Sequence, residues 1–268
     1  MTKNIFIDKV VIITGSRQGI GKTLAHMLGS LGAKLVINGR KSVELEQTKN
    51  ELAEKGYDVL AVVGDVSNPE DCKKIITSTV KHFGRIDILI NNAGLAAKGS
   101  VEDSNPTVFK KLVDVNILGS VYPTKYALPY IKESNGSIIF ISSLAGISGL
   151  PYNSAYSTSK MALTAFAESL KIELYKTKVH VGISYVSFTE NDPNKVVFNS
   201  EGKLEILPKR LNVKKMPVSK TASLILKQIE NRKFKVVLSS LGKISWFLNK
   251  VSPWLVEKIK IRSIKKFQ

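Results

Sequence analysis

Short apolar runs alternate with longer stretches of mixed polarity along this chain. Seven runs, four to six residues long and rich in Val and Ile, have the length of buried strands. They lie at 10–13, 34–38, 58–63, 87–91, 137–142, 180–185 and 234–238. Helix-forming stretches separate them, for instance at 43–55, at 70–83 and, with breaks, at 107–131. Regular alternation of strand and helix predicts an α/β fold with a seven-stranded parallel sheet flanked by helices.

The pattern indicates one compact unit followed by a tail. A chain of 268 residues is long for one small domain, but a doubly wound sheet of this size commonly forms a single core. No internal repeat, low-complexity tract or linker divides it. We therefore predict a domain at 1–240, with a lid over the substrate at about 191–216, and a helical tail at 241–268.

The first apolar run is followed by a glycine-rich turn and then by a helix-forming stretch at 22–28. The turn consists of Gly15, Ser16, Arg17, Gln18, Gly19, Ile20 and Gly21. Its glycines permit a tight turn and a close approach of the backbone to a pyrophosphate. The start of the next helix adds free N–H groups and the positive end of the helix dipole. The segment predicts dinucleotide binding in a Rossmann-type domain.

A second set of polar residues suggests acid–base chemistry on a carbonyl. Tyr156 and Lys160 are four positions apart in a segment of helical pattern, so their side chains share one face. A phenol has a reference pKa of about 10 and needs a nearby cation, such as Lys160, to work near neutral pH. Ser143, thirteen residues before Tyr156, would hydrogen-bond the oxygen on which charge grows. By itself, a Tyr-x-x-x-Lys pair also arises by chance on many helices.

From about Asp8 to about Tyr185, the chain resembles the short-chain dehydrogenase/reductase family. The glycine turn and the set of Ser143, Tyr156 and Lys160 are joined, in the order of the family, by Asp65-Val66, by Asn91-Asn92-Ala93-Gly94 and by Asn116. The resemblance implies that Asp65 and Val66 close over the adenine and that Asn92, Ala93 and Gly94 form a cofactor wall. It also implies that Tyr156 and Lys160 bind the nicotinamide ribose and that Asn116 orders a water beside Lys160. For at least one of Asn91 and Asn92, satisfaction of buried backbone groups explains the residue equally well.

The end of the second apolar run bears on the type of cofactor. A site that prefers NAD places a carboxylate about 20 residues after the glycine motif to hold the ribose hydroxyls. Gly39 occupies that position here, Arg40 follows it, and Arg17 can approach the same ribose from the glycine turn. Two cations without a carboxylate suit a 2′-phosphate, so we expect NADP(H).

Charge is concentrated at the end of the chain. The net charge is +18, and residues 203–268 contribute 17 Lys and Arg against three Glu. Residues 241–267 interleave basic and apolar residues with both tryptophans, Trp246 and Trp254, and Ser252-Pro253 would start a second helix. Two interpretations remain open: docking on an anionic membrane surface, or packing on the body or on a sister subunit. Nucleic acid is not expected, because no recognition module accompanies the basic residues.

Composition narrows the setting. Cys72 is the single cysteine, and the three histidines are scattered, so neither an intramolecular disulfide nor a metal site is expected. Residues 1–8 lack the apolar core of a secretory signal, so we expect a cytoplasmic protein, peripheral at a membrane if the tail docks. The family resemblance implies a homodimer or homotetramer, formed through the long helices that contain Asn116 and Tyr156.

The segment after residue 185 bears on the substrate. It departs from the Pro-Gly pattern of the family, and Thr189 is the candidate partner for the nicotinamide carboxamide. The lid mixes apolar and charged residues, as a mobile cover over a lipophilic ketone would. This loop and the tail loosely resemble the ketosphinganine reductase and hydroxysteroid dehydrogenase branches.

These observations predict an NADPH-dependent oxidoreductase that reduces a carbonyl to an alcohol, or the reverse, on a substrate such as a long-chain keto lipid. A ketoacyl thioester or a steroid is the alternative substrate. A non-catalytic NADP-binding scaffold or sensor is the alternative of another class; loss of Ser143, Tyr156 or Lys160 would have indicated it, and all three are present.

Overall fold

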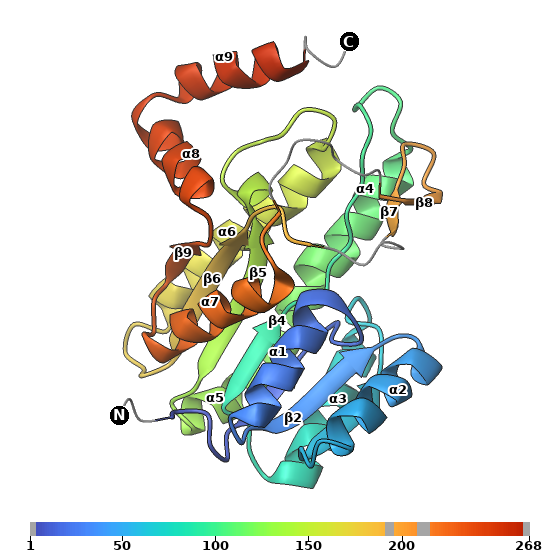
Figure 1. Cartoon of the computed structure of the whole chain (residues 1–268), viewed down its shortest axis with the longest axis vertical. Coiled ribbons are helices and arrows are strands. Elements are labelled where there is room, and N and C mark those ends of the chain that lie inside the picture. The colour runs from blue at the N-terminus through green and yellow to red at the C-terminus, as the bar shows by residue number, and fades with distance from the viewer. Residues whose placement is uncertain (1–3, 191–195, 208–214, 265–268) are drawn as a thin grey trace.

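The computed structural model of the chain describes residues 4–190, 196–207 and 215–264. Within them, seven strands form one parallel sheet in the order β3-β2-β1-β4-β5-β6-β9 (Figure 1). The strands are β1 (Val10–Ile13), β2 (Lys34–Gly39), β3 (Val59–Val63), β4 (Ile88–Asn91), β5 (Ser137–Ser143), β6 (His180–Val186) and β9 (Lys235–Val237). Each coincides within two residues with one of the predicted apolar runs. The α/β class and the parallel sheet are confirmed.

Helices cover both faces of the sheet and enclose two apolar cores. One face carries α1 (Gly19–Ser30), α2 (Ser42–Ala53) and α7 (Val218–Glu230), and the other carries α3 (Pro69–Phe83), α5 (Gly119–Glu133) and α6 (Ser154–Glu173). In Figure 1, α1 and α7 lie in front of the sheet. Because both faces are buried, the strands are continuous apolar runs and show no alternation of polar and apolar residues.

The order of the strands reverses direction between β1 and β4. The connections from β1 run outward through β2 to β3, and the chain then crosses back to β4 and continues to β5, β6 and β9. In open parallel sheets, ligands bind at such a switch point, outside the carboxyl ends of the strands. The glycine turn follows β1, and Ser143 ends β5, so the fold brings both predicted sets to this edge of the sheet.

Two regions show features that the apolar pattern did not indicate. The predicted helical stretch at 107–131 consists of α4 (Pro106–Leu112), a π-helix (Val113–Leu118) and α5. The lid region contains an antiparallel pair, β7 (Val196–Phe198) and β8 (Leu204–Ile206), that pairs with Ala97 through Phe198. Positions 191–195 and 208–214 of the predicted lid lie outside the described residues.

The predicted pair of tail helices corresponds to α8 (Ser240–Val251) and α9 (Pro253–Ile264).

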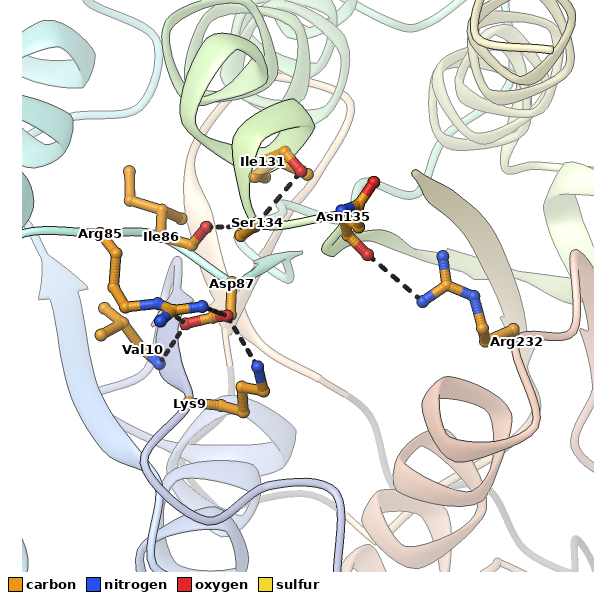
Figure 2. A network of polar contacts seen from close by, with 9 residues as sticks. All are labelled: Lys9, Val10, Arg85, Ile86, Asp87, Ile131, Ser134, Asn135 and Arg232. Carbon is orange, nitrogen blue, oxygen red and sulfur yellow. Dashed lines mark hydrogen bonds and ion pairs between the residues drawn. The ribbon is translucent and has the colours of Figure 1, made fainter. Parts of the chain in front are cut away.

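A buried carboxylate organises the opposite, amino-terminal edge of the sheet. Asp87 is 2% exposed and accepts hydrogen bonds from the Val10 amide, from Lys9 Nζ and from the Arg85 guanidinium at 2.7–3.1 Å (Figure 2). Nearby, Ser134 Oγ donates to the Ile86 carbonyl and ties the end of α5 to β4. A buried charge needs such compensation. This network therefore belongs to the scaffold, and the site lies at the other edge.

His180 makes the stability of this scaffold depend on pH. Its ring is buried between the Ser137 hydroxyl and the Lys233 carbonyl, and burial lowers the pKa of His180 to about 4. The unfolded chain takes up this proton near pH 6.5, before the folded chain does. Stability is therefore complete above that pH and declines as the pH falls toward 4.

We expect the free energy of unfolding to fall between pH 6.5 and 4 by up to about 1.4 kcal/mol per pH unit through this one group. Urea unfolding of wild type and His180→Gln across this range measures the effect, and the variant should give the flatter curve. Exposed His82, changed to Gln, is the control. Equal slopes for wild type and His180→Gln would contradict the assignment.

Candidate active site

The glycine turn has room for backbone only. Gly15 has a φ of +63°, and a Cβ there would lie 2.8 Å from Ala93 Cα; a Cβ on Gly21 would lie 2.5 Å from Asn92 Nδ2. Side chains at these two positions would collide with the segment after β4. Among the described residues, no side chain caps the N-terminus of α1, which begins at Gly19. Its first N–H groups are directed at the switch point and fit a pyrophosphate.

Asn92 and Thr14 hold the two sides of this turn together. The Asn92 amide group donates to the carbonyls of Thr14 and Gly15 at 2.9 and 3.0 Å, and Thr14 Oγ1 accepts from the amides of Asn92 and Ala93. Asn91 is buried and donates to Thr124. The sequence left open whether Asn91 or Asn92 serves to satisfy buried backbone groups. Asn92 does so, because it bonds the carbonyls of the glycine turn. Its predicted contact with the cofactor stays a prediction.

The end of β2 contains a small ionic network. Gly39 lies against Arg17, whose guanidinium pairs with Glu44 in the first turn of α2. Arg40 pairs with Asp65 at 3.4 Å. The expectation that no carboxylate stands near these arginines is wrong, because α2 starts three residues after Gly39 and returns Glu44 to this edge. The absence of a carboxylate at position 39 itself is unaffected.

Asp65 and Val66 follow β3, as the family resemblance implied. Burial would raise the pKa of Asp65, but hydrogen bonds from the Ser67 hydroxyl and amide, together with the Arg40 guanidinium, lower it overall. Asp65 is therefore an anion fixed beside Arg40, at the end of β2. Val66 is buried against Gly119, and a Cβ on Gly119 would lie 2.7 Å from the Val66 side chain. The role of both residues at an adenine stays a prediction.

Ser143 and Tyr156 meet at the carboxyl end of β5. Ser143 is the last residue of the strand, and its Oγ accepts a hydrogen bond from the Ala145 amide at 3.3 Å. Tyr156 lies in the first turn of α6 and is hydrogen-bonded to Ser143. Burial raises the pKa of the Tyr156 phenol, and the Ser143 hydroxyl opposes part of that rise. Tyr156 is thus a neutral proton donor at physiological pH, and the overall direction of its pKa shift is opposite to the lowering by Lys160 that the sequence suggested.

Lys160 lies one turn further along α6 and is buried. Its Nζ donates to the Ile141 carbonyl at 2.9 Å and lies 6.0 Å from the centre of the Tyr156 ring. A Cβ on Gly94 would lie 3.4 Å from Lys160 Nζ and 3.2 Å from Asn116 Oδ1. Gly94 therefore lies next to both the ammonium group and the Asn116 amide, and a side chain there would crowd both.

The π-helix places Asn116 in this group. Asn116 donates to the Leu95 carbonyl at 3.0 Å and to Ser159 Oγ at 2.8 Å, and its Oδ1 accepts from the Leu95 amide at 2.7 Å. π-Helical turns occur often at functional sites, because they shift one residue out of the regular helical register. Ser159, between Tyr156 and Lys160 in sequence, was not predicted. Its hydrogen bond to Asn116 joins α6 to the π-helix.

Thr189 lies farther from this group. Its Oγ1 is within 3.3 Å of the Ser187 carbonyl and of Thr221 Oγ1 in α7, and its backbone pairs with Met216. The side chain is buried against α7. The predicted contact with a nicotinamide carboxamide stays a prediction.

The tail helices contact the segment that follows Ser143. Packing on the body was one of the interpretations of the sequence, but the sequence did not indicate this segment. Lys260 Nζ donates to Ser148 Oγ and to the Gly149 carbonyl, both at 2.7 Å. Asn249 donates to the Ile147 carbonyl at 3.5 Å, and a Cβ on Gly242 would lie 2.8 Å from Leu144 Cδ2. We call these contacts the tail clamp. The tail clamp contacts residues 144–149, which form the first part of the connection from Ser143 to α6.

A cavity of about 510 Å³ lies between α9 and the start of α6. Leu150, Pro151 and Met161 line one side, and Val256 and Ile261 line the other. Ser143, Tyr156 and Lys160 are not among its lining residues. The cavity therefore lies beside the candidate site, behind the connection that the tail clamp holds.

These features, a glycine turn after β1 and a Ser, Tyr and Lys group at the carboxyl end of β5, have the arrangement expected of an oxidoreductase with a dinucleotide cofactor. A family model for the short chain dehydrogenases matches residues 9–201. The chain belongs to this family, whose members act on alcohol and carbonyl groups.

Relatives and solved structures agree with this assignment. The 11-beta-hydroxysteroid dehydrogenase 1A of Arabidopsis thaliana is 37% identical over 265 residues, covering 96% of this chain and 75% of the relative. A short chain dehydrogenase/reductase from Burkholderia phymatum, solved with NAD, has a TM-score of 0.82 at 24% identity over 93% of this chain and 95% of its own. An alcohol dehydrogenase from the archaeon Thermococcus sibiricus, solved with 5-hydroxy-NADP, has a TM-score of 0.74 at 25% identity over 85% and 95%.

Proposed function

We propose that this protein is an NADP(H)-dependent carbonyl reductase that acts on a lipophilic ketone, or on the corresponding alcohol in reverse. The observation that carries the proposal is the hydrogen-bonded pair of Ser143 and Tyr156, with buried Lys160 one turn away, at the carboxyl end of β5. In this family a bound nicotinamide exchanges a hydride with the carbon of the carbonyl or alcohol. The side chains of this chain handle the proton and the charge on oxygen.

Each side chain has a distinct part in the proposed reduction. Tyr156 gives its proton to the substrate oxygen, and a pKa raised by burial keeps that proton in place at neutral pH. Ser143 hydrogen-bonds the same oxygen as negative charge develops. Lys160 stabilises the phenolate that remains, and Asn116, through Leu95 and Ser159, holds the helices that carry these groups at a fixed distance. In alcohol oxidation the same proton passes back to Tyr156.

The preference for NADP(H) rests on the end of β2. Gly39 leaves that position without a carboxylate to hold unmodified ribose hydroxyls, and Arg17 and Arg40 flank it. Both arginines are partly exposed in their pairs with Glu44 and Asp65, and exposed ion pairs are weak. A dianionic 2′-phosphate can therefore replace the carboxylates with charge-assisted hydrogen bonds.

A lipophilic substrate is supported by the surface around the lid. Phe188, Val196, Leu204 and Ile206 expose apolar side chains near the carboxyl edge of the sheet, and Phe198 is paired to Ala97 beside the candidate site. The name of the Arabidopsis relative places a steroid among the candidates. A long-chain keto lipid presents the same combination of one carbonyl and a large apolar surface.

A panel of ketones followed by NADPH absorbance tests this function. A long-chain ketone or a steroid ketone should give a kcat/KM at least tenfold above that of a short, water-soluble ketone. Each buried CH2 contributes about 0.8 kcal/mol, or about fourfold. A ketoacyl thioester with the highest value would replace the proposed substrate class. No NADPH-dependent turnover with any of these compounds would favour a non-catalytic scaffold.

A further inference from the structure

The tail helices expose a continuous row of apolar side chains. On α8 these are Leu241, Ile244, Phe247 and Val251, and on α9 they are Trp254, Leu255 and Ile259. Phe247 is 60% exposed and Trp254 is 62% exposed. We call this set the outer tail face. In Figure 1, α8 and α9 stand at the end of the molecule away from the N-terminus, with α9 beyond the sheet and its covering helices.

This face points away from the body of the protein. The side of α8 that packs inward carries Gly242, Trp246 and Asn249, which contact Leu144, the core cluster and Ile147 respectively. The exposed residues of α8 recur every three or four positions on the opposite side of the helix. Packing on the chain's own body, one of the two interpretations of the sequence, therefore does not account for them.

Cations surround the apolar row. Besides Lys260 of the tail clamp, the described part of α8 and α9 contains Lys243, Lys250, Lys258 and Arg262 against a single acid, Glu257. Lys258 Nζ lies 3.7 Å from the centre of the Trp254 ring, and Lys250 Nζ lies 4.0 Å from the centre of the Trp246 ring. Apolar side chains, interfacial Trp and Lys side chains that extend past them are the features of a helix lying in a membrane surface.

We propose that the outer tail face docks on an anionic lipid membrane. The charge favours this partner over a second copy of the chain, because a two-fold contact through the same face would bring two surfaces with an excess of positive charge together. Neither helix crosses the bilayer. Each has 12 residues, about 18 Å at 1.5 Å per residue, against about 30 Å of hydrocarbon. Among the described residues, no helix meets the length and apolarity needed to span a membrane.

Co-sedimentation of the full chain with vesicles tests the proposal. We expect binding to phosphatidylcholine vesicles that contain phosphatidylserine, at least tenfold weaker binding to phosphatidylcholine alone, and release by high salt. The double variant Phe247→Ser/Trp254→Ser should lose at least tenfold in binding. So should Lys250→Glu/Lys258→Glu, which keeps the apolar residues. These side chains are exposed, so the thermal transition should stay close to that of wild type.

The matched control is Ile172→Ser/Tyr175→Ser, which removes two side chains that are 71% and 74% exposed at the far end of α6. It should bind the anionic vesicles as wild type does. Equal loss in this control, equal binding to neutral vesicles, or no vesicle binding would overturn the proposal. So would a dimer in light scattering that Phe247→Ser/Trp254→Ser converts to a monomer without any change in vesicle binding. None of these readouts depends on catalytic activity, so they test docking separately from the proposed function.

Discussion

Tyr156→Phe is expected to lower kcat for carbonyl reduction by about 10²- to 10⁴-fold, the usual range for loss of a positioned proton donor. The phenol of Tyr156 is hydrogen-bonded to Ser143 and has a pKa raised by burial, so at neutral pH it carries the proton that the substrate oxygen needs. The ring itself stays in place in the variant, because Phe differs from Tyr only by the hydroxyl. NADPH binding, measured by fluorescence titration, should weaken by no more than about fivefold, the effect of losing one neutral hydrogen bond to the ribose, because the loss of the proton donor acts on the rate and not on ground-state binding.

Tyr175→Phe is the control, because Tyr175 is exposed at the end of α6, away from the site. A Tyr156→Phe variant with near-complete turnover would remove Tyr156 from the reaction. A second measurement separates chemistry from structure. Alcohol oxidation needs the deprotonated phenol, so its rate should rise with pH. Ser143→Ala removes a hydrogen bond that lowers the pKa of Tyr156, so the rise should move to higher pH.

Gly39→Asp is expected to reverse the cofactor preference. A Cβ at position 39 would have its nearest neighbours, Arg17 Cβ and Leu45 Cδ1, at 3.7 Å, which is ordinary van der Waals contact. The new carboxylate can accept hydrogen bonds from unmodified ribose hydroxyls and would repel a 2′-phosphate. At about 4 Å and an effective dielectric constant of about 20, that repulsion is about 4 kcal/mol before screening by salt. We expect kcat/KM with NADPH to fall by about a hundredfold or more, and the value with NADH to rise.

Gly39→Ala separates charge from size in this experiment. Alanine fills the same space without a carboxylate, so it should keep the preference of wild type. Comparable efficiency of the wild type with NADH and NADPH would defeat the proposed preference at the outset. A fall with NADPH of the same size in Gly39→Ala and Gly39→Asp would assign the effect to crowding.

The sequence indicated the sheet and the site well because both depend on local pattern. The β-strands are buried on both faces, so each is a short apolar run between turn residues, and Gly15 and Gly21 mark a turn that must pass close to another segment. Tyr156 and Lys160 share a helical face through their spacing alone. Such features need no knowledge of distant residues.

The missed features depend on contacts between distant parts of the chain. Glu44 reaches Arg17 only because α2 folds back along β2, and Lys260 meets Ser148 across 112 positions. The strands β7 and β8 have three residues each, too few for an alternating pattern to be recognised. The π-helix around Asn116 is rich in Val, Asp and Asn, which are weak helix formers, but such a composition does not distinguish a π-helical turn from a break in an α-helix.

The tail clamp affects how shortened forms of this protein should be judged. A chain cut before Lys243 would lose the exposed apolar residues of the tail from Ile244 onward and gain solubility, which makes the cut attractive for crystallisation or compound screening. The same cut removes Asn249 and Lys260 and leaves the backbone at Ile147 and Gly149 without their bonds to the tail. Poor turnover by such a fragment would therefore describe a loosened connection after Ser143, and substrates should be screened with the full chain.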